Sequence, residues 1–125
     1  MSPAQVVVIG AGPGGLAAAA ALGARGVQAL VVDRDSQVGS SWRRHYERLH
    51  TPRRWSGLPG YPVPRRFGRW VARADVVAYL EEYVAHHGIQ LRLGTAVTRI
   101  ERAGAAASHR ADAAAGDTAA NSARW

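Results

Sequence analysis

Cysteine is absent from the 125-residue sequence, and so is lysine. Without cysteine the chain has no disulfide, no thiol nucleophile and no thiolate metal site. No apolar run approaches the ~18 residues of a membrane-spanning helix, and the amino terminus lacks the basic and apolar regions of a signal peptide. We therefore expect one small cytoplasmic domain without a membrane partner.

The positive charge of the chain comes from arginine alone. All 16 basic residues are arginine, against 9 acidic residues, and residues 41–74 hold a net charge of +8. Such a segment can attract nucleic acid or a phosphorylated cofactor, or form a solvated face or a protein interface. Because no nucleic-acid-binding module accompanies it, we expect no nucleic-acid partner.

The amino-terminal stretch carries the clearest motif. Four apolar residues, Val6–Ile9, predict a strand buried on both faces, and a helix is predicted over Leu16–Leu22. Between them Gly10, Gly12 and Gly15 follow the pattern G-x-G-x-x-G. The first glycine permits a tight turn, the second lets backbone approach a pyrophosphate, and the third allows close helix–strand packing. The start of the helix then attracts the diphosphate.

An acid stands where this motif requires one. Residues 27–32 form a second strand-like run, and Asp33 ends it, 18 residues after Gly15. This is close to the ~20 residues expected for a carboxylate that binds a ribose hydroxyl. The full strand–loop–helix–strand–acid pattern favours a dinucleotide-binding unit over a nucleotide-free turn.

The remaining chain predicts one more crossover and then a tail. Prolines and glycines in residues 43–73 exclude a long helix or a central strand there. Asp75 is a candidate N-cap of a helix with an apolar stripe, which Gly88 would end. Ile89–Leu93 alternates as a third parallel strand, which residues 97–100 extend or restart. The prediction is an incomplete α/β, Rossmann-like fold over residues 1–102, with an alanine-rich, disordered tail over 103–125.

Aromatic and imidazole side chains gather in the irregular segment. They are His45, Tyr46, His50, Trp55 and Trp70. Two interpretations are open: these side chains stack on a flat ligand ring, or they cover the edge of the sheet.

Side-chain catalysts are not apparent. His86 and His87 are adjacent and diverge by ~100° on a helix, so they do not form a metal site. Ser40 and Ser41 lack the context of a nucleophile elbow. We predict no metal and name no catalytic residue, so any chemistry would come from a cofactor.

Several motifs in order resemble flavin-containing monooxygenases, in their bacterial and plant branch. They are Val-Ile-Gly-Ala-Gly-Pro-Gly-Gly-Leu over residues 8–16, Asp33, Gly-Ser-Ser-Trp-Arg-Arg-His-Tyr-Glu-Arg-Leu-His over 39–50, Leu-Pro-Gly-Tyr-Pro-Val-Pro over 58–64, and Tyr-Leu-Glu-Glu-Tyr-Val over 79–84. The resemblance implies an oxidoreductase that reduces FAD with NADPH and transfers one oxygen atom of O₂ to a small molecule.

The resemblance also implies roles for individual residues. The FAD pyrophosphate would lie on a loop made of Gly10, Gly12, Pro13, Gly14 and Gly15. Asp33 would hold the adenosine ribose with Arg34 beside it, and Val97 would present backbone to the adenine. Trp42, Leu49 and His50 would lie toward the flavin.

The sequence departs from the family pattern in length and content. It lacks the second glycine-rich motif, so the NADPH site of full-length members is absent, and Ser40 replaces a common glycine. The chain is thus interpreted as an amino-terminal FAD-binding portion. One alternative, a disulfide-reductase-like oxidoreductase, is disfavoured because no Cys-x-x-Cys exists. Another is an orphan dinucleotide-binding module or truncated product without activity.

Overall fold

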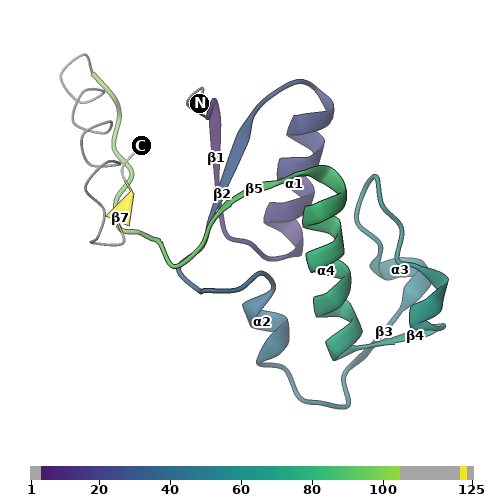
Figure 1. Ribbon diagram of the computed structural model, residues 1–125. Helices are drawn as coiled ribbons and strands as arrows, with labels where there is room; N and C mark the ends of the chain where they lie inside the picture. The colour runs from purple at the N-terminus through teal and green to yellow at the C-terminus, as the bar shows by residue number, and fades with distance from the viewer. Residues whose placement is uncertain (1–3, 105–121, 124–125) are drawn as a thin grey trace.

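The computed structural model describes residues 4–104 and 122–123. Its centre is a parallel sheet in the order β1-β2-β5, made of β1 (Val6–Ile9), β2 (Ala29–Val32) and β5 (Gln90–Arg92). Helices α1 (Pro13–Ala24) and α4 (Arg73–His87) connect these strands and lie side by side (Figure 1). The predicted α/β fold with two crossovers and a parallel third strand is confirmed.

Strand β1 is less buried than its sequence predicts. Val6 and Ile9 are 36% and 52% exposed, whereas Val31 and Val32 of the central strand β2 are fully buried. Among the described strands β1 pairs with β2 alone and so forms an edge of the sheet. The prediction of burial on both faces was wrong here because it assumed a strand or helix on every side of β1.

Helix α4 begins three residues earlier than predicted. Its N-cap is Ala72, because strand β4 (Trp70–Ala72) leads directly into Arg73. Asp75 is therefore not the cap but lies in the first turn, where a negative charge still favours the helix dipole. Gly88 ends the helix in a left-handed conformation with φ 61°, as predicted.

The irregular segment is made of short elements, and all but the first form a small lobe beyond α4. The first is α2 (Ser40–Arg43), which contacts α4, and those of the lobe are β3 (His50–Pro52), α3 (Arg53–Ser56), the 3₁₀ turn η1 (Arg65–Phe67) and β4. Strands β3 and β4 pair antiparallel, and with α3 they lie on the side of α4 away from the parallel sheet (Figure 1). Trp55 and Trp70 are exposed on this lobe, so they do not cover an edge of the parallel sheet.

Tyrosine hydroxyls fix the loop of this lobe to α4. The Tyr79 hydroxyl accepts a hydrogen bond from the Leu58 amide at 2.8 Å and donates one to the Tyr61 carbonyl. The Tyr83 hydroxyl donates to the Pro59 carbonyl at 2.5 Å. Burial raises the pKa of both Tyr79 and Tyr83, which keeps these hydroxyls protonated as donors.

The core lies between the sheet and the two long helices. Its most buried side chains come from α1, β2, β4 and α4, and they are Leu16, Val31, Val32, Val71, Leu80 and Tyr83. The predicted stripe on α4 is largely buried, with Val76, Val77, Leu80 and Tyr83 inside and Val84 packed against the cluster. Within the described ranges no helix has the length and apolar character to span a bilayer.

The predicted tail, residues 103–125, lies mostly outside the described residues. Strand β6 (Ala96–Val97) restarts the chain after β5, and it pairs in parallel with β7 (Ser122–Ala123). The domain boundary at residue 102 therefore stays a prediction.

Candidate functional site: the glycine loop and the hollow beside Asp33

The glycine loop joins β1 to α1 through a backbone that needs glycine. Gly10 has φ 112°, a conformation that side chains disfavour, and its amide donates to the Val32 carbonyl at 2.8 Å. A Cβ on Gly15 would collide with the Gly10 carbonyl oxygen. Gly15 thus allows α1 to pack against the loop, as its place in the motif predicts.

Open space lies over the other glycines of the loop. A Cβ built on Gly10, Gly12 or Gly14 meets no atom within 4 Å. Gly12 is the N-cap of α1, and no side chain from the described part of the chain caps this end of the helix. The first amides of a helix lack intrahelical partners and sit at the positive end of its dipole. The loop therefore offers both the room and the donors that a diphosphate needs.

Asp33 follows β2 and links the glycine loop to the turn after β5. Its Oδ2 accepts a hydrogen bond from the Ala11 amide at 2.7 Å, and its Oδ1 accepts one from the Asp35 amide at 2.8 Å. Its carbonyl accepts from the Thr95 amide at 2.9 Å. Each carboxylate oxygen keeps a further lone pair that could accept from a ligand hydroxyl.

A hollow of about 290 Å³ opens beside this carboxylate at the carboxyl ends of β1 and β2. Its lining residues are Ile9, Gly10, Val32, Asp33, Arg34, Thr95, Ala96 and Val97. Four of the predicted site residues, Gly10, Asp33, Arg34 and Val97, thus come together around one space. Crevices at the carboxyl ends of parallel strands are where such folds bind ligands.

Sequence reasoning missed Thr95 in this hollow. Thr95 is buried, and the preceding Gly94 has φ 62° and donates its amide to the Asp35 carbonyl at 2.9 Å. The available signal was the Gly94-Thr95 pair directly after the third strand, since a glycine there marks a turn that returns the chain to the sheet edge.

The predicted flavin-side residues lie outside this hollow. Trp42 is half-buried on α2, and its ring meets His45 edge-on with centroids 5.4 Å apart. Leu49 and His50 lie at the start of β3, where His50 is exposed. The segment that carries these residues is connected to the glycine loop at Gly39, whose amide donates a hydrogen bond to the Ala11 carbonyl at 3.0 Å.

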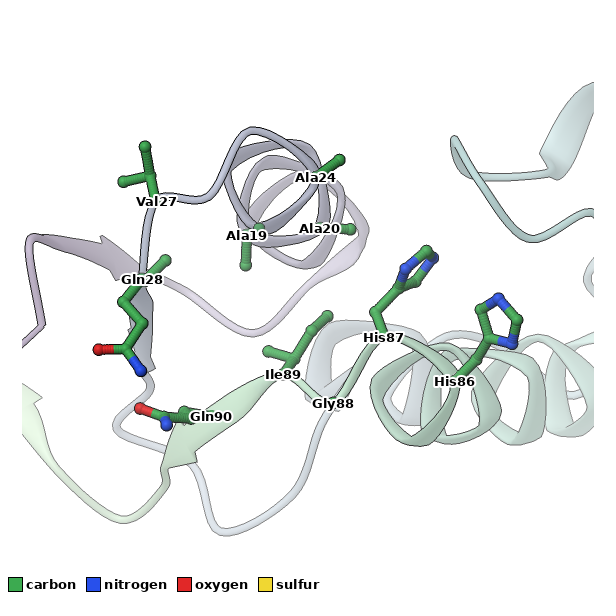
Figure 2. Close-up of a pocket in the computed structure, with 12 residues that line it drawn as sticks. Ala19, Ala20, Ala24, Val27, Gln28, His86, His87, Gly88, Ile89 and Gln90 are labelled. Carbon is green, nitrogen blue, oxygen red and sulfur yellow. The ribbon is translucent and has the colours of Figure 1, made fainter. Parts of the chain in front are cut away.

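A second hollow, of about 420 Å³, lies at the opposite end of the sheet. Figure 2 shows it between α1, the start of β5 and the end of α4, with small side chains such as Ala20 and Ala24 and the ring of His87 around it. The His86 and His87 rings meet edge-on, 4.8 Å between centroids. Among the described residues no three potential metal ligands gather. The lining of this hollow includes no glycine of the G-x-G-x-x-G motif.

The comparisons with known proteins find oxidoreductases. Residues 7–114 match the family described as pyridine nucleotide-disulphide oxidoreductase. The chain is 46% identical over 94 residues to the indole-3-pyruvate monooxygenase YUCCA1 of Oryza sativa subsp. japonica, covering 73% of this chain and 23% of that protein. It is 37% identical over 89 residues to the probable indole-3-pyruvate monooxygenase YUCCA1 of Arabidopsis thaliana, covering 69% and 22%.

Solved structures point the same way. A flavin-containing monooxygenase from Stenotrophomonas maltophilia superposes with a TM-score of 0.73 at 34% identity, over 83% of this chain and 32% of that one. The chain therefore spans about a quarter of the length of these curated relatives and a third of this solved structure.

Proposed function

Because this chain belongs to the pyridine nucleotide-disulphide oxidoreductase family, we propose that it binds the ADP half of FAD. It would do so as the amino-terminal portion of an NAD(P)H-dependent flavin monooxygenase that oxygenates a small molecule. The observation that carries the proposal is the single space around which Asp33, Arg34 and Val97 meet the glycine loop. The similarity to proteins named indole-3-pyruvate monooxygenases supports the small-molecule substrate.

Each part of the site has a proposed task in holding the cofactor. The amides of Gly12, Gly14 and Gly15 at the start of α1 would face the diphosphate. The Asp33 carboxylate would accept from the ribose hydroxyls. FAD would supply the chemistry, since a flavin accepts hydride from NADPH and passes electrons to oxygen.

The predicted site residues outside the glycine loop would orient the two ends of FAD. Arg34 would lie beside Asp33 at the adenosine ribose, and the Val97 backbone would face the adenine. Trp42, Leu49 and His50 would lie toward the flavin. This chain's residues would bind and orient the cofactor, and none is proposed to transfer a proton.

A second candidate is dinucleotide binding without catalysis. It is favoured by the lack of a second G-x-G-x-x-G in the 125 residues. A thiol-based disulfide reductase gains no support from these residues, because the sequence has no cysteine. A cytoplasmic location and the absence of nucleic-acid and membrane partners stay predictions.

The test of the proposed function is ligand titration of the purified chain. ADP binding is followed by calorimetry and FAD binding by flavin fluorescence, for the natural sequence and for Gly12→Val. The valine side chain would enter the open space over the loop, so both affinities should fall at least tenfold, about 1.4 kcal/mol.

The matched control is Gly57→Ala. Gly57 has an ordinary φ of −72° and lies in the loop beside α4, where a Cβ makes ordinary contacts. Its affinities should equal those of the natural sequence. A folded Gly12→Val variant with unchanged affinity for both ligands would refute the assignment of the loop.

A further inference from the structure

The segment from Gly39 to Leu49 connects the glycine loop to the β3–β4 lobe. It carries Trp42 and ends at Leu49, two residues that the proposed function places toward the flavin. Its first end is tied to the site, because the Gly39 amide donates to the Ala11 carbonyl at 3.0 Å. The position of its second end then decides where these two residues lie.

The second end runs into β3, which pairs with β4 from His50 onward, and the stretch before it is tied to α4 by Arg73. The Arg73 Nη1 donates to the Arg43 carbonyl at 3.0 Å and to the His45 carbonyl at 2.6 Å. The Arg73 amide donates to the Leu49 carbonyl at 3.1 Å. Arg73 is the first residue of α4, so these three bonds join the segment to the rigid start of a 15-residue helix.

Other support for this part of the segment is local or exposed. Its remaining backbone bonds, from Arg43 to Gly39, from His45 to Trp42 and from Leu49 to Tyr46, join residues three or four apart. The ion pair of Arg44 with Asp35, at 3.5 Å, is largely exposed on the arginine side. Residues 44–48 are all exposed, so they contribute little to the core. A guanidinium that holds two carbonyls forms charge-assisted bonds, which are stronger than neutral ones. Between α2 and the start of β3 at His50, the long-range contacts of residues 43–49 are therefore those of Arg73 and the Arg43–Glu81 ion pair.

We propose that Arg73 is a positioning residue for the flavin half of the cofactor. It acts through the carbonyls of Arg43 and His45, and it holds the segment so that Trp42 and Leu49 face the flavin end of FAD. The inference rests on the proposed function, because it requires that FAD binds along this path. The glycine loop lies at the other end of the segment, so the ADP half of the site is independent of Arg73.

The test compares two ligands on the same variants. Arg73→Met keeps an unbranched side chain and removes the donors, and Arg69→Met is the control, since Arg69 is exposed four residues earlier. The natural chain should bind FAD about tenfold more tightly than ADP. Arg73→Met should lose most of this difference, with ADP affinity unchanged, and Arg69→Met should keep it.

Two further measurements separate positioning from a general structural role. Amide hydrogen exchange in Arg73→Met should accelerate at residues 44–49 while the amides of α1 and β2 keep their protection. Arg73→Lys retains the charge but presents a point donor instead of a fork, so it should restore part of the FAD preference.

Each remaining outcome contradicts a stated claim. Equal loss of FAD and ADP affinity, or failure of both Arg73 variants to fold, would show a structural role and overturn the inference. An unchanged FAD preference in Arg73→Met would overturn it too, as would equal affinity of the natural chain for FAD and ADP. If the natural chain binds neither ligand, the proposed function itself fails. The affinities of the natural chain for FAD and ADP are therefore measured before any Arg73 variant is made.

Discussion

A methyl group on Gly15 would press against the carbonyl oxygen of Gly10, whereas a methyl group on Gly14 would meet open space. The two neighbouring glycines therefore serve different purposes in one motif. Gly15 is required by packing between the helix and the loop, and Gly14 leaves the start of α1 accessible. Because the contact at Gly15 is with backbone, no side-chain rotation can relieve it.

This difference predicts the stabilities of two single-methyl variants. Gly15→Ala should lower the free energy of unfolding by at least ~1–3 kcal/mol, the cost of overpacking. Gly14→Ala should leave it unchanged or raise it by up to ~1 kcal/mol, because alanine loses less entropy than glycine in a helix. Urea unfolding of both variants provides the comparison. Equal stability of the two would contradict the packing seen around Gly15.

At the residue scale the sequence predicted the motif but not all of its partners. The spacing from Gly15 to Asp33 predicts an acid at the end of the second strand, and Asp33 lies there. The hydrogen bond from the Ala11 amide to Asp33 was not predictable, because spacing does not say which backbone group a carboxylate meets. Thr95 was missed since a lone threonine after a strand belongs to no motif.

Helix α4 joins the sheet to the lobe, and its tyrosines carry that junction. Tyr79 makes two hydrogen bonds to the loop at Leu58 and Tyr61, while Tyr83 makes one to Pro59. Tyr79→Phe should cost ~1–3 kcal/mol of stability, because it leaves the Leu58 amide without its partner. Tyr83→Phe should cost less, because a carbonyl that loses one donor is more easily satisfied by water.

Thermal unfolding of the two phenylalanine variants gives the comparison. The Tyr83→Phe chain is the matched control, since it removes one hydroxyl from the same face of the same helix. A larger loss of stability from Tyr83→Phe than from Tyr79→Phe would reverse the expected order and contradict this account of the loop.

The carboxyl end of α4 predicts a dependence of stability on pH. Burial, and then the nearby His86, lowers the pKa of His87 below the ~6.5 of an unfolded chain. Its Nε2 is buried against the loop at Gly60 and has no hydrogen-bond partner among the residues that the structure describes. The unfolded state therefore binds the proton more readily. The contribution of neutral His87 to stability is complete above pH ~6.5 and is lost as the pH falls through the folded pKa.

The check is urea unfolding between pH 8 and pH 5. The natural chain should lose more stability over this interval than His87→Gln, which removes the titrating ring. His45→Gln, at an exposed position between α2 and β3, should follow the natural chain. Parallel curves for the natural chain and His87→Gln would show that the ring titrates equally in both states.

At the scale of elements, periodicity predicted the long pieces and missed the short ones. The stripe of α4 extends over enough residues to show a period, and β1 and β2 stand out as uninterrupted apolar runs. Strands β3 and β4 have three residues each, and they form through their pairing and their contact with α4 rather than through local preference. The N-cap error at Asp75 has the same origin, because β4 continues into α4.

For the whole molecule, the arginine-rich segment has a partly structural role. Arg43 pairs with Glu81 and Arg66 pairs with Glu82, so two arginines fasten the segment to α4. Arg73 binds backbone carbonyls. The sequence predicted the site of positive charge but not this use, because pairing across 16 to 38 residues depends on the fold.

The last prediction concerns what the 125-residue polypeptide does by itself. Hydride transfer requires the nicotinamide to stack against the flavin, and the glycine loop described here accounts for a single dinucleotide. The sequence contains no second G-x-G-x-x-G. Correct orientation supplies ~7–11 kcal/mol of a reaction barrier, so a chain without the second nucleotide site should lose most of the rate.

The arginines of residues 43–73 can attract the 2′-phosphate of NADPH, but attraction without alignment adds little turnover. We therefore expect weak FAD binding and no substrate-dependent oxidation of NADPH. The measurement is anaerobic stopped-flow mixing of the FAD-loaded chain with NADPH, following the loss of flavin absorbance, with free FAD as the control. Bleaching much faster than that of free FAD would show that this portion alone aligns both cofactors and is a working reductase.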